Sequence, residues 1–232
     1  MRTAELLSTA HVGAGDEVVV PSYATAATAE AVRDTGALPV FADIAPQSLC
    51  LDPASVSRAI TARTVAVAAV PLFGHPVDLA ALQRAAGRTV LVLAPTDPTD
   101  GAEEGEGEEG VARRRANAAY LDARLTGVTP VTAPGILHRY HSYVVRVPGN
   151  GRPDRDAFAR ALLDRGVRCR VPVQTPVHRL PSFRRELWLP ETERAAGECL
   201  ALPVDAGTSR RELQRLVAAC NALGGLLPAA AA

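Results

Sequence analysis

The sequence predicts an α/β protein, with a partial layer of parallel strands and helices followed by a smaller α+β part. Strand-like and helix-like segments alternate through the first part, which is typical of a parallel sheet covered by helices. A stretch made almost only of Gly and Glu follows, and after it helices mix with short strands. We therefore expect a partial large α/β domain at 1–100, a flexible linker at 101–110, a helix plus a small α+β domain at 111–224, and a frayed tail at 225–232.

The first part contains four expected strands with helices between them. The strands are Glu17–Pro21, Leu38–Phe41, Thr64–Val70 and Thr89–Leu93, and the helices are Thr25–Asp34, one that begins at Pro53 and one from Asp78 to Ala86. The third and fourth strands are almost continuously apolar, which indicates strands buried on both faces. Asp52 and Asp78 stand where a carboxylate can accept hydrogen bonds from the first N–H groups of a helix.

The second part is expected to contain four helices and two strands. The helices are an Arg-rich one at Val111–Leu125 and others at Asp154–Arg165, Glu191–Leu200 and Ser209–Ala222, and the strands are His141–Val147 and Val167–Val171. Ser209 is the expected N-cap of the last helix. The basic cluster Arg113–Arg115 is interpreted as a solvated helix face.

Composition excludes several classes of partner. All 25 basic residues are arginine, none is lysine, and the formal net charge at pH 7 is +0. A neutral chain has no general attraction to nucleic acid or to an anionic membrane, so we expect neither. The longest apolar run, Val65–Phe73, is too short to cross a bilayer, and the four cysteines form no CxxC pair. We expect a cytoplasmic protein with reduced thiols.

Several motifs occur in the order known from one enzyme family. They are GAGDEVVVPSYATAATAEAV (Gly13–Val32), GALPVFADIAPQSLCLDP (Gly36–Pro53), TARTVAVAAVPLFGHPVDL (Thr61–Leu79), RRRANAAYLDARL (Arg113–Leu125), YHSYVVR (Tyr140–Arg146), VQTPVHRLPSF (Val173–Phe183) and LALPV (Leu200–Val204). Together they resemble the DegT-type (StrS-like) sugar aminotransferases, which are fold-type-I enzymes that use pyridoxal phosphate (PLP). The resemblance implies a nucleotide-sugar or secondary-metabolite amination lineage, PLP as the family cofactor, and active sites at a dimer interface.

The chain departs from this family where the cofactor would be held. The resemblance places Thr25 at the aromatic that stacks on PLP and Pro95 at the Asp that keeps the pyridinium protonated, while Asp97 is interpreted as a turn residue. The phosphate-binding turn would fall at residues 1–4, where we expect it to be incomplete. The Gly/Glu stretch replaces the segment that carries the Schiff-base lysine. We therefore expect no catalytic residue, no cofactor-binding residue, no metal ligand and no covalently bound PLP.

Three functional hypotheses remain open at this point. The first is a family relative that lacks PLP catalysis, and the second is a partner subunit that docks on a full-length homologous aminotransferase. The third is a protein that binds a nucleotide sugar without PLP, with His178, Arg170 and Tyr140 as substrate-binding residues. Since strands of the large domain are missing, we expect an exposed sheet edge and an uncovered sheet face, both of which favour a homo- or hetero-oligomer.

Histidine and serine residues outside these motifs give weaker signals. His138 and His141 run into an expected strand, where their spacing places them on opposite faces, so we interpret them as structural. Ser22 and Ser142 lack a GxSxG elbow, which argues against a hydrolase.

Overall fold

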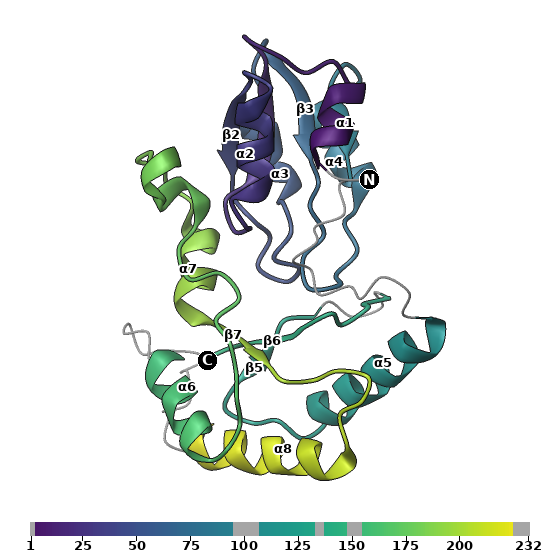
Figure 1. Cartoon of the computed structure of the whole chain (residues 1–232), viewed down its shortest axis with the longest axis vertical. Helices are drawn as coiled ribbons and strands as arrows, with labels where there is room; N and C mark the ends of the chain where they lie inside the picture. The colour runs from purple at the N-terminus through teal and green to yellow at the C-terminus, as the bar shows by residue number, and fades with distance from the viewer. Residues whose placement is uncertain (1–2, 95–106, 133–136, 148–154, 225–232) are drawn as a thin grey trace.

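The computed structural model describes residues 3–94, 107–132, 137–147 and 155–224. A parallel α/β layer lies at one end of the molecule and an antiparallel sheet with helices lies at the other (Figure 1). Helix α7 lies beside the place where the two parts meet. No described helix is long and apolar enough to cross a membrane.

The first part is a four-stranded parallel sheet in the order β2-β1-β3-β4. Its strands are β1 (Glu17–Pro21), β2 (Leu38–Ala42), β3 (Thr64–Ala68) and β4 (Leu91–Leu93), and its helices are α1 (Thr3–Thr9), α2 (Ala27–Asp34), α3 (Pro53–Ala59) and α4 (Leu79–Ala86). The predicted alternation of strands and helices is confirmed, and α1 is an addition to it.

Both faces of this sheet are covered in the described residues. Val18 and Val20 of β1 pack in one core cluster with Val32 of α2. Val19 points to the other face and packs in a separate cluster that includes Val56 of α3. The expectation of an uncovered face was therefore wrong, because helices α1 to α4, together with Val177, Phe183 and Leu189 of the second part, cover β1 and β3.

The fourth strand differs from the prediction. Thr89–Leu93 was expected to be a buried strand, but β4 has three residues and Leu91 is 50% exposed. Within the described residues β4 pairs only with β3, so one edge has no partner strand. The sequence pattern could not show this, because an apolar run is the same for a central strand and for a strand left at an edge.

Local capping signals were predicted correctly. The Asp52 side chain accepts hydrogen bonds from the backbone N–H groups of Ala54 and Ser55, and Asp78 accepts one from Ala81. Ser209 and Glu212 hydrogen-bond to each other's backbone N–H groups at the start of α8. This reciprocal arrangement is a capping box.

The second part is built on a three-stranded antiparallel sheet in the order β5-β6-β7. Its elements are α5 (Glu108–Asp122), β5 (Thr129–Pro130), β6 (Tyr143–Arg146), α6 (Arg155–Asp164), the short 3-10 helices η1 (Val177–Arg179) and η2 (Pro181–Phe183), α7 (Pro190–Glu198), β7 (Cys199–Leu202) and α8 (Arg210–Gly224). Helices α5, α6 and α8 share one apolar core with β6 and β7.

Three predicted elements of this part need correction. Val167–Val171 is not a strand, because it makes a single bridge between Arg170 and Ala201 before Pro172 interrupts the pattern. The helix expected at Glu191–Leu200 ends at Glu198, and Cys199 begins β7. Helix α5 begins at Glu108, inside the Gly/Glu stretch. The predictions for Pro95, Asp97 and residues 225–232 lie outside the described residues.

Candidate functional site

The carboxyl ends of β1, β2 and β3 form the natural place for a ligand site, because parallel α/β sheets bind ligands at that edge. Ser22 follows β1 directly, and Asp43 follows β2 directly. A segment from the second part, residues 170–198, contacts this edge and ends in α7 (Figure 1). A ligand could therefore reach only the part of this edge that the segment does not cover.

His178 closes the end of β1. Its Nδ1 lies 2.6 Å from the Ser22 Oγ, and its backbone N–H donates to the same oxygen at 3.1 Å. Its Nε2 lies 2.9 Å from Oε1 of Glu193 on α7. Burial lowers the pKa of His178. Ser22, His178 and Glu193 are thus connected by contacts in this order. Ser22 and His178 are fully buried, so a substrate cannot reach them.

Asp43 closes the end of β2. Its two carboxylate oxygens accept hydrogen bonds from the backbone N–H groups of Glu191 and Thr192, at 3.0 and 2.8 Å. The Thr192 hydroxyl donates a further bond of 2.8 Å. The N-cap residue of α7, Leu189, offers no capping side chain, so Asp43 supplies the cap from another part of the chain. We name Ser22, Asp43, His178, Thr192 and Glu193 the carboxylate junction.

A second contact between the two parts follows β3. The Gly74 carbonyl accepts a hydrogen bond from the Arg139 N–H at 2.8 Å, and the Phe73 carbonyl accepts one from Ser142 at 3.3 Å. Gly74 has a φ of +87°, and a Cβ placed on it would lie 2.8 Å from the Tyr140 backbone nitrogen. Phe73 and Tyr140 are also left-handed. Only glycine fits this close approach of two backbones.

Two buried histidine rings lie at the same contact. The centroids of His75 and His138 are 5.4 Å apart, and Tyr140 packs on His138 at 4.1 Å. Burial lowers the pKa of His75, and burial with the nearby His75 lowers the pKa of His138 to about 3. His75 Nδ1 donates to the Pro76 carbonyl, and its buried Nε2 has no hydrogen-bond partner among the described residues. We name residues 73–75 and 138–142 the histidine junction.

The arginine cluster on α5 supports this junction. Arg114 is buried and donates from Nε to the Arg139 carbonyl, while Arg115 donates to the His138 carbonyl, both at 2.9 Å. Arg113 alone forms the expected exposed pair, with Glu109. The interpretation of all three as a solvated face was therefore wrong, because the partners of Arg114 and Arg115 come from a distant segment.

A small cavity is left open beside the histidine junction. Its volume is about 150 Å³, and its lining includes Thr25, Phe73 and Arg170. Arg170 donates from one guanidinium nitrogen to the Ser142 hydroxyl at 2.5 Å. Small-molecule pockets usually begin at about 300 Å³, so this cavity suits at most a small ligand or part of a larger one.

The three sequence-predicted substrate residues do not line one described cavity. Arg170 lines the small cavity, His178 is sealed in the carboxylate junction, and Tyr140 stacks on His138. A nucleotide-sugar site formed by these residues stays a prediction. Among the described residues, no group of three or more His, Cys, Asp or Glu side chains is arranged to hold a metal ion.

Comparison with known proteins decides the family. A sequence model of the DegT/DnrJ/EryC1/StrS aminotransferase family matches residues 4–96 and 106–221. The chain belongs to this family. The match is interrupted at residues 97–105, which overlap the Gly/Glu stretch at 101–110.

Two curated relatives show how the likeness is distributed. The erythromycin biosynthesis sensory transduction protein EryC1 of Saccharopolyspora erythraea is 30% identical over 298 positions, which cover 91% of this chain and 80% of EryC1. Because 298 positions exceed the 232 residues of this chain, EryC1 has residues at more than sixty of them where this chain has none. L-glutamine:2-deoxy-scyllo-inosose aminotransferase of Micromonospora echinospora is 49% identical, over 82 residues that make up 20% of its length.

Solved structures confirm the fold class. DesV of S. venezuelae, in complex with a ketimine intermediate, matches with a TM-score of 0.80 and 25% identity over 96% of this chain and 82% of DesV. The aminotransferase TlmJ from Streptoalloteichus hindustanus matches with a TM-score of 0.78 and 25% identity over 97% of this chain and 83% of TlmJ. The predicted relationship to the fold of PLP aminotransferases is confirmed.

The residues of this chain do not fit the family cofactor. A Schiff base with PLP needs a side-chain primary amine, and none of the 232 residues is lysine. Thr25, which the resemblance places at the stacking aromatic, lines a cavity of only about 150 Å³. Its hydroxyl side chain offers no ring face to a pyridine. These residues therefore support no reaction step through PLP.

Proposed function

We propose that this chain is a sugar-aminotransferase relative that does not carry out PLP-dependent transamination by itself. The observation that carries the proposal is the absence of lysine from the sequence. Arginine cannot replace it, because the guanidinium stays protonated and cannot form an aldimine. The lineage is that of sugar and secondary-metabolite amination, as in the relatives named above.

The structure of the strand ends supports the proposal. Ser22 and Asp43 follow the strands at the edge where a ligand would be expected, and both are committed to hydrogen bonds with His178 and α7. These contacts bury polar groups that would otherwise be available to a ligand. The edge thereby serves to join the two parts of the molecule.

Titration of the full chain with PLP, followed by borohydride reduction and peptide mass spectrometry, tests the proposal. We expect no induced visible circular dichroism and no reduced PLP adduct on any side chain, since no side chain carries a primary amine. DesV of S. venezuelae is the positive control. Peptide mapping separates an adduct on the α-amino group of Met1 from one inside the fold. Conversion of PLP to pyridoxamine phosphate by the chain with an amino donor, faster than in buffer, would contradict the proposal.

A second candidate function is that of a partner subunit for a full-length homologous aminotransferase. The observation that favours it is the edge of β4, which has no partner strand among the described residues and carries the half-exposed Leu91. An unpaired edge presents free N–H and C=O groups to another chain.

Co-expression with a full-length relative and size-exclusion chromatography test this candidate. We expect one co-eluting complex, and the substitution Leu91→Arg should abolish it by placing a charge on the edge. Leu163→Arg is the matched control, because Leu163 is 55% exposed on α6, in the other part of the molecule. Two species that elute separately for the unmodified chain would rule the candidate out.

A further inference from the structure

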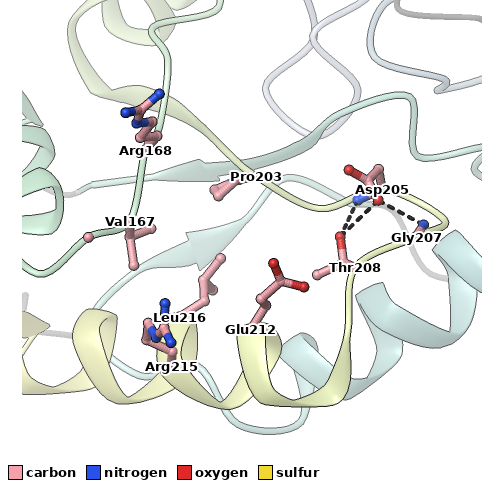
Figure 2. Close-up of a pocket in the computed structure, with 10 residues that line it drawn as sticks. Val167, Arg168, Pro203, Asp205, Gly207, Thr208, Glu212, Arg215 and Leu216 are labelled. Atoms are coloured by element: carbon pink, nitrogen blue, oxygen red, sulfur yellow. Dashed lines mark hydrogen bonds between the residues drawn. The ribbon is translucent and has the colours of Figure 1, made fainter.

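A larger cavity opens in the second part of the molecule, away from the strand ends discussed above. Its volume is about 330 Å³, which lies at the small end of the range of ligand pockets, about 300–1,000 Å³. The cavity is lined by Gly166, Val167, Arg168, Pro203, Asp205, Gly207, Thr208, Glu212, Arg215 and Leu216 (Figure 2). None of these residues belongs to the parallel sheet or its loops.

Positive and negative groups lie at different places around this cavity. Figure 2 shows Arg168 and Arg215 toward one end, with Arg168 well above Arg215 in the view, Asp205 toward the other end, and Glu212 on α8 between Arg215 and Asp205. The lining thus carries two positive and two negative charges. A ligand with a single charge would meet groups of the same sign on one side.

In each of the carboxylates of Asp205 and Glu212 one oxygen accepts hydrogen bonds, and the other makes none within the described residues. Oδ1 of Asp205 accepts hydrogen bonds from the Gly207 N–H at 2.8 Å and the Thr208 hydroxyl at 3.1 Å. Oε2 of Glu212 accepts from the Ser209 N–H and hydroxyl at 2.8 and 2.6 Å. These bonds from Ser209 lower the pKa of Glu212. The bonds to the two side chains fix the orientation of both carboxylates and leave Oδ2 of Asp205 and Oε1 of Glu212 without a hydrogen bond in the part of the chain that the structure describes.

The guanidinium groups of Arg168 and Arg215 make fewer hydrogen bonds than the two carboxylates. Neither Arg168 nor Arg215 makes a hydrogen bond or a salt bridge to another residue in the part of the chain that the structure describes. Arg215 is one helical turn after Glu212 and interacts with it electrostatically. A guanidinium presents a fork of N–H donors that matches the geometry of a carboxylate.

The wall between the charged groups is partly apolar. Val167 and Leu216 are buried residues of the core, and they line the cavity together with Pro203. This surface suits an aliphatic group of a few carbon atoms.

We propose that this cavity binds a small zwitterion that carries an ammonium group, a carboxylate and an aliphatic side chain, which is the chemistry of a free α-amino acid. The carboxylate pairs with Arg168 and Arg215, and the ammonium group pairs with Asp205 and Glu212. The aliphatic side chain rests on the apolar wall. The site is independent of the proposed function, since it shares no residue with the carboxylate junction, the histidine junction or the small cavity at Thr25.

Isothermal titration of the full chain with three matched probes tests the proposal. L-valine carries both charged groups, isovalerate lacks the ammonium group, and isobutylamine lacks the carboxylate. We expect saturable binding of L-valine and at least about 10-fold weaker binding of each of the other two, because each loses one set of charge-assisted hydrogen bonds. Isovalerate binding as tightly as L-valine would overturn the proposal in favour of a simple anion site.

Substitutions locate the binding site. Arg168→Met and Arg215→Met should each weaken L-valine binding by about 10-fold. Glu212→Gln should weaken it while its amide oxygen still caps α8. Arg211→Met is the matched control, since Arg211 is exposed on the same helix outside the cavity. Far-UV circular dichroism checks that each variant is folded. No saturable binding of L-valine, or unchanged binding in both arginine variants, would overturn the proposal.

Discussion

The two junctions between the parts of this molecule are built differently. In the carboxylate junction, side-chain hydrogen bonds join Asp43 at the end of β2 to α7, and His178 to Ser22 at the end of β1. In the histidine junction, the backbone around Gly74 lies against the backbone around Tyr140. The first depends on the chemistry of a few polar groups, and the second depends on the absence of one Cβ atom. The residues that join the two parts should therefore differ in which substitutions they tolerate.

The largest effect is expected from Gly74→Ala, which tests the histidine junction. The added Cβ would lie 2.8 Å from the Tyr140 nitrogen and 2.9 Å from the His141 nitrogen, and the φ of +87° is itself strained for alanine. We expect the free energy of unfolding to fall by about 4 kcal/mol, measured by urea denaturation.

Gly87→Ala separates the effect of the positive φ from the effect of the close approach between backbones. Gly87 has a φ of +86°, but a Cβ placed there would meet no atom within 4 Å. We expect it to lower the free energy of unfolding by about 2 kcal/mol, because alanine rarely adopts its backbone conformation of φ +86° and ψ 177°. Equal losses in the two variants would mean that backbone conformation, and not the close approach, makes Gly74 necessary.

The next effect is expected from Asp43→Ala, which tests the carboxylate junction. The substitution leaves the N–H groups of Glu191 and Thr192 and the Thr192 hydroxyl without their acceptor in a buried place. We expect a loss of about 3 kcal/mol in the free energy of unfolding.

Two further variants sharpen this measurement. Asp43→Asn keeps one acceptor oxygen and should lose less stability than the alanine variant. Asp34→Ala, at an exposed position at the end of α2, should change stability by less than about 0.5 kcal/mol. A loss for Asp43→Ala no larger than that of the control would show that α7 does not depend on this cap.

The smallest effect is expected from a change of pH, which acts on stability through His138 of the histidine junction. The pKa of His138 is about 3 in the folded chain, below its ordinary value of about 6.5 in an unfolded chain. As pH falls below about 6.5, the unfolded chain binds the proton first, so stability that is complete above this pH is lost progressively toward pH 3. Between pH 7.5 and pH 5 we expect this histidine to account for a loss of about 2 kcal/mol.

Urea denaturation of His138→Asn at both pH values tests this expectation. The asparagine oxygen can replace Nδ1 as the acceptor for the Tyr140 N–H, while the titrating group is gone. The difference in unfolding free energy between the two pH values should shrink by about 2 kcal/mol. His11→Gln, at an exposed histidine, is the control. An unchanged difference in His138→Asn would place the pH dependence on other groups, such as His75 or His178.

The sequence by itself determined the elements whose signals are local. Strand β1 and the caps at Asp52 and Asp78 follow from residues within a few positions of one another, so pattern and capping chemistry sufficed to predict them. The order of motifs also determined the family, and the absence of lysine determined that this chain offers no Schiff-base amine to PLP.

Only the tertiary structure decided how the strand ends are used. Asp43 has the sequence signature of a strand-end residue, and its partner Thr192 stands 149 positions away. Ser22 and His178 are 156 positions apart, and Gly74 meets Tyr140 far along the chain. A hydrogen bond or a close backbone approach between such distant residues leaves no periodic trace in either segment. Packing therefore decides which polar groups are buried in a junction and which remain accessible to a ligand.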